Sequence, residues 1–326
     1  MSAQRTVEAP APASQARVAT VPWWRQTKWE ARIAFVLFIA PMVLGLTVFT
    51  FIPIIWGFLL SFSEAQNTLS LGEFIGFQNY VDMLQNREFR RSLVTILIFT
   101  AFIVPLTYAF SLLLAMLVHT AGFGRSFFRT VFFIPTAISY VIASLVWRMG
   151  IFNGLPYGVA NMVIYSLGID KVIDWIGTPE PPWYWLVLVT CRLWLQVGFY
   201  MIIFLAGLSE IDQSLYEAAY VDGARPGWTT FRTITLPMLA NTSVAVLTLN
   251  FIAAFQAFDE FYNILGGTMS TAGNINLART PLIYLYQVAI GQQDFGRGSA
   301  GAFILTFIII IITLVQGRIL GFGNRR

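Results

Sequence analysis

The chain contains six apolar runs, each long enough to cross a lipid bilayer as one helix. A bilayer core about 30 Å thick needs about 20 consecutive helical residues. Each run is continuously apolar, whereas the strands of a membrane barrel alternate apolar and polar residues, so helices are expected. The runs lie near residues 32–62, 93–118, 128–149, 184–208, 238–262 and 299–319. The sequence therefore predicts an all-α membrane protein with six transmembrane helices.

The composition agrees with a chain embedded in lipid. Only 11% of its residues are charged and 57% are hydrophobic, whereas a soluble domain carries about a quarter charged residues. No dense basic run lies outside the termini, so nucleic acid is not an expected partner. One cysteine, Cys191, and one histidine, His119, cannot build a disulfide or a Cys-based zinc site within the chain. We therefore expect no catalytic residue, no metal and no cofactor in this chain.

The apolar runs define one transmembrane domain with two tails. Residues 1–30 are rich in Ala, Pro, Ser and Gln, and they predict a disordered cytoplasmic tail that ends in a membrane-surface anchor of aromatic and cationic residues. The predicted transmembrane domain covers residues 31–320, and residues 321–326 form a C-terminal tail. Prolines are expected to bend or kink the first three spans. They are Pro41, Pro53, Pro105 and Pro135.

Cations next to the spans set the expected orientation, because cytoplasmic loops carry an excess of Arg and Lys. With six spans, most of these cations fall on the same side of the membrane as both termini. They are Arg25, Lys28, Arg32, Arg125, Arg129, Arg225, Arg232, Arg318, Arg325 and Arg326. Arg87, Arg90 and Arg91 are exceptions on the opposite side, which also holds most of the acidic residues. Both termini are therefore predicted to be cytoplasmic.

The loop of residues 210–237 is a polar segment between the fourth and fifth spans, on the predicted cytoplasmic side. Asp212 is a good N-cap for a short helix, and Gly223 can end that helix in a left-handed conformation. Pro226 suits the first turn of a second short helix, and Pro237 suits the first turn of the fifth span. These signals predict a helix–turn–helix. The alternative is a helical connector with no further role.

The same loop carries a long pattern of mixed residue types. Its residues are Glu217, Ala218, Ala219, Asp222, Gly223, Ala224, Phe231, Ile234, Leu236, Pro237 and Leu239. This pattern resembles the EAA loop of bacterial ABC import permeases. The resemblance covers nearly the whole chain, including the segment 76–80 after the first span. The chain is similar to the carbohydrate-uptake group, which contains the relatives of maltose and glycerol-phosphate permeases.

The resemblance implies a type I ABC importer permease fold and a set of partners in the bacterial inner membrane. The implied assembly holds a second, homologous but different permease, two ATP-binding subunits and an extracytoplasmic solute-binding protein. ATP and Mg would bind in the ATPase partner. Independently of the resemblance, the chain contains no G-x-x-x-x-G-K-[ST] loop. The energy for transport must therefore come from a partner or from an ion gradient.

The resemblance also implies roles for the loop residues. The 210–237 loop would be the coupling helix, seated in a groove of the ATPase subunit. Glu217 would interact electrostatically with this groove, and Gly223 would permit the turn. Ala218 and Ala219 would allow close packing against the partner.

Polar and aromatic residues in the fourth and fifth spans are candidates for the solute pathway, because polar groups in lipid are costly and point to function. The candidates are Arg192, Trp194, Gln196, Tyr200, Asn250, Gln256, Phe258 and Asp259. Two alternatives stay open. Arg192 pairs with Asp259 or Glu260 as a structural bridge, or the polar groups simply hydrogen-bond between helices.

Two other classes of function compete with an ATP-driven importer. An ion-driven secondary transporter normally has more spans and often an internal repeat, and it would leave the 210–237 loop unexplained. A membrane-embedded transferase needs clustered carboxylates or a nucleophile with a base, and no histidine or lysine accompanies the adjacent Asp259 and Glu260. The sequence thus favours a permease subunit that imports a sugar or sugar-like solute and is not itself an enzyme.

Overall fold

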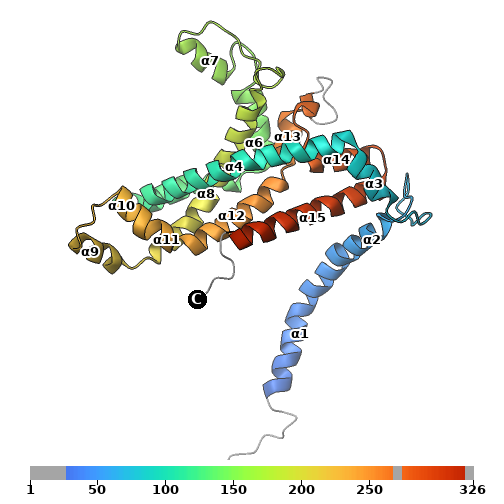
Figure 1. The fold of residues 1–326 in the computed structure, drawn as a ribbon, viewed down its shortest axis with the longest axis horizontal. Helices are drawn as coiled ribbons and strands as arrows, with labels where there is room; N and C mark the ends of the chain where they lie inside the picture. Colours follow the sequence, from blue (N-terminus) through green and yellow to red (C-terminus); the bar gives the residue numbers. More distant parts are fainter. Residues whose placement is uncertain (1–26, 267–273, 320–326) are drawn as a thin grey trace, which may run out of the picture. The chain divides into compact units, whose positions relative to one another are not determined.

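The structure, a computed structural model, describes residues 27–266 and 274–319, which form helices joined by turns, with no β-strand among them (Figure 1). Isolated backbone bridges join Ser63 to Phe74 and Gln66 to Asp294. The chain separates into two compact units, residues 1–56 and residues 57–326. The α-helices are α1 (Thr27–Leu46), α2 (Ile52–Leu60), α3 (Gln78–Gln85), α4 (Arg87–Thr120), α5 (Arg125–Phe133), α6 (Tyr140–Leu145), α7 (Val159–Ser166), α8 (Tyr184–Ser209), α9 (Gln213–Val221), α10 (Trp228–Thr230), α11 (Leu236–Met238), α12 (Ala240–Phe255), α13 (Asp259–Ile264), α14 (Pro281–Tyr286) and α15 (Phe295–Ile319).

Wide π-helical turns precede two of the prolines. A proline ring inside a helix clashes with the carbonyl four residues earlier. Before Pro53, the N–H of Ile52 bonds to the carbonyl of Thr47, five residues back. Before Pro237, the N–H of Leu236 bonds in the same way to the carbonyl of Phe231. The wider turn gives each ring room, and α2 continues to Leu60 after Pro53, whereas α11 ends one residue after Pro237.

The remaining turns are short. Further π turns cover Val146–Ile151 and Gln287–Gly291, and 3-10 turns cover Ile134–Ala137 and Asn274–Leu277.

The prediction of six spans agrees with the structure only when broken helices are counted. Four single helices among the described residues are long and apolar enough to cross a membrane: Arg32–Leu60, Arg87–Thr120, Tyr184–Ser209 and Phe295–Arg318. Two bent helix pairs bring the number up to six when each pair counts as one span.

A proline lies shortly before each of the two bends. The third span bends by 89° between Ala137 and Tyr140, directly after the 3-10 turn that contains Pro135. The fifth bends by 71° between Met238 and Ala240, where Leu239 is fully buried. The kink expected at Pro135 is therefore a sharp break. Pro105, in contrast, lies inside the continuous helix α4, so the second span is not broken there.

The predicted C-terminal limit of the fifth span, near residue 262, is wrong. The bend at Leu239 separates Met238 from α12, and α12 ends at Phe255. A new helix, α13, begins at Asp259, with Asp259 and Glu260 in its first turn. Carboxylates are stabilised at a helix N-terminus by the partial positive charge of the free N–H groups. This local preference favours a new helix start over the continuous span that hydropathy predicts.

The core of residues 57–319 forms around the straight helices α4 and α8, which pack along each other and against α12. Phe99 of α4 and Phe261 of α13 are fully buried, and their ring centroids lie 4.8 Å apart in an edge-to-face contact. Such pairs add stability beyond their buried area. The core therefore ties α13 to α4 although α13 has only six residues.

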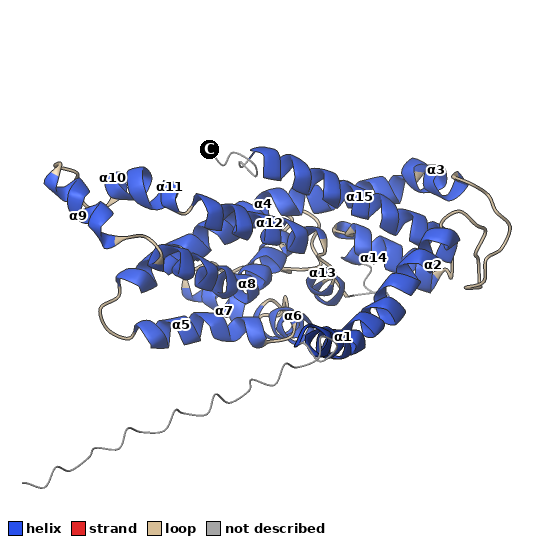
Figure 2. Ribbon diagram, turned by 90° about the horizontal axis from the view of Figure 1, so that it is seen from below, coloured by secondary structure: helices blue, strands red, loops and turns tan. Residues whose placement is uncertain are grey.

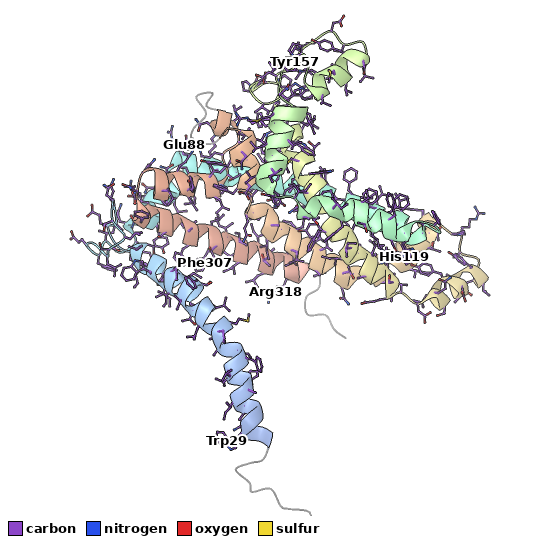
Figure 3. All side chains as sticks on the ribbon, turned by 180° about the vertical axis from the view of Figure 1, so that it is seen from behind. Trp29, Glu88, His119, Tyr157, Phe307 and Arg318 are labelled. Atoms are coloured by element: carbon purple, nitrogen blue, oxygen red, sulfur yellow. The ribbon has the colours of Figure 1, made fainter. Side chains whose placement is uncertain are left out.

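A small lobe between the third and fourth spans contains α7, and Figure 3 labels Tyr157 within it. Buried Asn161 organises this lobe. Its Nδ2 donates to the carbonyls of Leu155 and Ile173, and its Oδ1 accepts from the N–H of Ile173 and from Nε1 of Trp175. Every donor and acceptor of the Asn161 amide is thereby used, which explains how a segment without a long helix keeps one conformation.

Gly198 of α8 lies close against the backbone of the third span. A Cβ at Gly198 would lie 1.8 Å from the carbonyl oxygen of Phe132. We predict that Gly198→Ala lowers stability by about 1–3 kcal/mol, because overpacking forces backbone shifts. A thermal unfolding midpoint of the detergent-solubilised protein measures this effect. Gly150→Ala is the control, because a Cβ there meets nothing within 4 Å. Equal midpoints for the two variants would contradict the prediction.

Candidate functional site

Helices α9, α10 and α11 lie at one end of the unit of residues 57–326, and α3 lies at the other (Figures 1 and 2). Helix α9 begins as predicted at Asp212, whose side chain accepts a hydrogen bond of 2.9 Å from the backbone N–H of Ser214. The backbone and side chain of Ser214 both lower the pKa of the fully exposed Asp212 carboxyl below its ordinary 3.8. The N-cap prediction is confirmed.

The N-cap leads to a pH-dependent prediction for α9. Because the pKa of Asp212 is lowered on folding, the cap stabilises α9 when the carboxyl is ionised, and this stabilisation is lost as the pH falls through the lowered pKa. At neutral pH we expect Asp212→Ala to speed hydrogen exchange of the Ser214 amide several-fold. Asp212→Asn keeps an acceptor oxygen and should remove only the pH dependence. Unchanged exchange in Asp212→Ala would rule the cap out.

The C-terminus of α9 also forms as predicted. Gly223 has φ +87°, in the left-handed region. Its N–H bonds to the carbonyl of Tyr220, and the N–H of Ala224 bonds to the carbonyl of Ala219. This pair of bonds is the Schellman motif, in which glycine has no Cβ penalty. The residues Asp222, Gly223 and Ala224 of the loop pattern therefore build the helix end.

The positions of the two prolines in the loop differ from the prediction. Pro226 precedes Gly227, which caps α10, so it lies before the second short helix and not in its first turn. Pro237 lies in α11, before the bend at Leu239, so it does not open the main part of the fifth span. Gly227, with φ +108°, takes the conformation that separates the two helices. A sequence reading that weighs only proline overlooks this glycine.

The surface of the loop is exposed and partly apolar. Val221 is 88% exposed and Trp228 is 73% exposed. Glu217 and Ala218 are exposed as well, whereas Ala219 is half-buried. Leu236 and Pro237 of the pattern are also exposed. Apolar and polar side chains therefore lie beside each other on the surface of the loop.

One hydrogen bond fastens α9 to the segment that follows it. The hydroxyl of Tyr216 lies 2.9 Å from Oγ1 of Thr235, and Thr235 is buried. This bond joins α9 to residue 235, in the segment that leads into the fifth span.

A second feature is a cavity of ≈ 340 Å³ beside α8. Its lining comes from the break in the third span, from α8 and from α12. The lining residues are Thr136, Tyr140, Leu195, Gln196, Phe199, Tyr200, Leu249 and Ala253. The structure thus brings together two of the predicted pathway residues, Gln196 and Tyr200, which lie one turn apart on α8. The Oε1 atom of Gln196 is buried and has no hydrogen-bond partner among the described residues.

Arg192 lies behind the wall of this cavity and is 4% exposed. Its Nη1 lies 2.5 Å from Oε1 of Glu260, and its Nη2 lies 2.5 Å from the carbonyl oxygen of Ala253. Its guanidinium carbon lies 5.3 Å from the ring centroid of Tyr140. Of the two carboxylates considered as partners, Glu260 forms the bridge, whereas Asp259 is exposed. The structural bridge left open by the sequence is therefore present.

The other predicted pathway residues lie outside the cavity. Trp194 packs on Trp147 with ring centroids 5.0 Å apart and lines a separate apolar pocket of ≈ 460 Å³. Fully buried Asn250 donates to the carbonyl of Val104 in α4 and so joins two helices. Phe258 belongs to an aromatic cluster, and Gln256 is exposed.

Sequence reasoning missed Tyr140, Phe199 and Ala253 as cavity residues. Phe199 follows Gln196 by three positions, so the helical period could have indicated it. Tyr140 and Ala253 come from other elements, and no local pattern indicates them.

In the described ranges, 27–266 and 274–319, no group of three or more His, Cys, Asp or Glu side chains could hold a metal ion.

Comparison with known proteins places this fold in a family. The family of binding-protein-dependent transport system inner membrane components matches residues 109–326. The chain belongs to this family. It is therefore an integral membrane protein of the bacterial inner membrane and a permease of an ABC transport system, and the resemblance seen in the loop pattern is confirmed. The family is one of transport permeases, consistent with a chain that is not an enzyme.

Individual relatives match along most of the permease. It is 32% identical over 301 residues to the arabinooligosaccharides transport system permease protein AraP of Bacillus subtilis, covering 91% of this chain and 92% of that protein. It is 31% identical to the trehalose/maltose transport system permease protein MalF of Thermococcus litoralis, covering 86% and 91%. A solved bacterial alginate ABC transporter, in complex with an alginate pentasaccharide-bound periplasmic protein, matches with a TM-score of 0.76 and 21% identity, covering 89% and 94%. The fold is that of an ABC importer permease.

Proposed function

We propose that this permease is one membrane subunit of an importer for a sugar or sugar-like solute. The named relatives belong to arabinooligosaccharide and trehalose/maltose transport systems, which supports a carbohydrate solute. The observation that carries the proposal is the exposed α9, which is capped at both ends and presents apolar side chains where a partner can bind. Both termini lie on the cytoplasmic side with α9.

The partners follow from the same proposal. Two ATP-binding subunits hold ATP and Mg, and one of them receives α9 of this chain. A second, homologous but different permease completes the membrane part, and an extracytoplasmic solute-binding protein delivers the solute. The solved relative in complex with a periplasmic protein supports the last of these partners.

Coupling runs along one continuous segment of the chain. Movement of the ATP-binding subunit displaces α9, and the Tyr216–Thr235 hydrogen bond passes this displacement to residues 228–238. The bend at Leu239 connects that segment to α12, whose residues Leu249 and Ala253 line the cavity. A displacement of the docking surface thereby changes the cavity wall. The solute passes this cavity, where Gln196 and Tyr200 offer hydrogen bonds.

The proposal is tested by solute uptake into proteoliposomes that contain the permease with its partner permease, ATP-binding subunits and binding protein. Uptake should require ATP and should persist when ionophores collapse ion gradients. Uptake that follows an ion gradient in the absence of ATP would identify a secondary transporter and overturn the proposal. A matched preparation without the ATP-binding subunits is the control and should be inactive.

A further inference from the structure

We propose that the cavity beside α8 accepts an uncharged saccharide unit and that Arg192 is a positioning residue for its wall rather than a ligand for an anionic group. The inference rests on the proposed function, because it names the charge class of the solute at that site. It concerns the cavity lined by Tyr140, Gln196, Phe199, Tyr200 and Ala253 together with three further residues.

The lining of the cavity is uncharged, with polar and aromatic groups side by side. All the lining residues are described, and none of them is charged at neutral pH. The polar groups are the amide of Gln196 and hydroxyls such as those of Tyr140 and Tyr200. Amide and hydroxyl groups can exchange hydrogen bonds with sugar hydroxyls. Aromatic faces beside it suit the apolar C–H faces of a sugar ring. The volume of ≈ 340 Å³ is at the lower end of the range for ligand pockets.

The positive charge of Arg192 is already paired with a carboxylate. Arg192 is 4% exposed and its partner Glu260 is 1% exposed, so the two groups compensate each other away from water. The second guanidinium nitrogen is bonded to the Ala253 carbonyl. An anionic solute could recruit Arg192 only by leaving Glu260 as an uncompensated buried charge, which is strongly unfavourable. An anion in this cavity would therefore find no available cation in the chain's own lining.

The contacts of Arg192 give it a different role. It joins Tyr140, the first residue after the break in the third span, to Ala253 near the end of α12 and to Glu260 in α13. Tyr140 lies directly after the break in the third span, whereas Ala253 and Glu260 lie on either side of the non-helical residues between α12 and α13. One side chain on helix α8 thus joins the break in the third span to both sides of the α12–α13 junction, and two of its contacts, Tyr140 and Ala253, are part of the cavity wall.

The test measures protection of the cavity from a thiol reagent in the purified permease pair, without binding protein or ATP. Ala253→Cys is introduced into a Cys191→Ser background, so that the new thiol is the only cysteine of this chain. We expect neutral gluco- or arabino-oligosaccharides at saturation to slow its modification by about tenfold. Oligogalacturonates of matched length should leave the rate unchanged. Thr313→Cys, in a separate pocket, is the control and should not be protected by either.

Protection by the acidic oligosaccharides equal to or greater than protection by the neutral ones would overturn the inference, and so would no protection by either. This readout needs no transport, so its failure is distinguishable from failure of the proposed function, which the uptake assay measures. Should Ala253→Cys fail to fold, Thr136→Cys places a thiol in the same cavity and is read in the same way.

Discussion

Gly223→Asp is expected to abolish ATP-driven uptake while the permease still folds and inserts into the membrane. Gly223 ends α9 with φ +87°, and a Cβ there meets nothing within 4 Å. The Cβ of the new side chain therefore clashes with none of the described residues. The local cost is the left-handed backbone, about 1–2 kcal/mol for an ordinary residue and less for Asp or Asn. The larger effect is a new charge on the surface that docks into the ATP-binding subunit.

Gly223→Asn is the matched control, because asparagine has the same size, tolerates the left-handed conformation and carries no charge. We expect Gly223→Asn to keep most of the uptake and Gly223→Asp to lose at least about 90% of it, which corresponds to a change of about 1.4 kcal/mol or more in coupling. Membrane insertion is measured in parallel. Wild-type uptake in Gly223→Asp would contradict a docking role for α9.

Breaking the Arg192–Glu260 bridge is expected to have the largest effect on stability. Removing one partner of a buried pair leaves an uncompensated charge and costs about 3–5 kcal/mol. We therefore expect Arg192→Gln and Glu260→Gln each to lower the thermal midpoint of the detergent-solubilised protein strongly. The double variant has no buried charge, so its loss should be smaller than the sum of the two single losses by at least about 1 kcal/mol.

Asp259→Asn is the control for this double-mutant cycle, because Asp259 is adjacent to Glu260 but exposed. A surface change of this kind alters the free energy of unfolding by no more than about 0.5 kcal/mol. Strictly additive effects of Arg192→Gln and Glu260→Gln would show that the two side chains act independently and would refute the bridge as a stabilising unit.

Local signals in the sequence predicted the two ends of α9 correctly. Asp212 and Gly223 act on backbone groups within a few residues, so their roles depend little on the rest of the fold. Continuous apolarity is also a local property of the sequence, and it predicted the spans that consist of one helix. The resemblance of the 210–237 pattern to a known loop then gave the family, because that pattern mixes residue types that no apolar helix requires.

Features that depend on tertiary contacts were not predictable. Leu239 lies at a 71° bend, yet it is apolar and fully buried, so hydropathy cannot distinguish it from a residue in a straight span. The choice of Glu260 over Asp259 as the partner of Arg192 depends on the phase of α13, which starts only after a non-helical break. Only part of the cavity lining was predicted. Gln196 and Tyr200 share α8, whereas Tyr140 and Ala253 come from other elements.

The most direct test of a docking role for α9 is photo-crosslinking in the assembled transporter. Val221, 88% exposed on α9, is replaced by p-benzoylphenylalanine, and Tyr157, 70% exposed in the lobe between the third and fourth spans, is replaced in a control. The account predicts a covalent adduct with the ATP-binding subunit from position 221 and none from position 157. An adduct with that subunit from position 157, or its absence from position 221 in an assembly that hydrolyses ATP, would contradict the account.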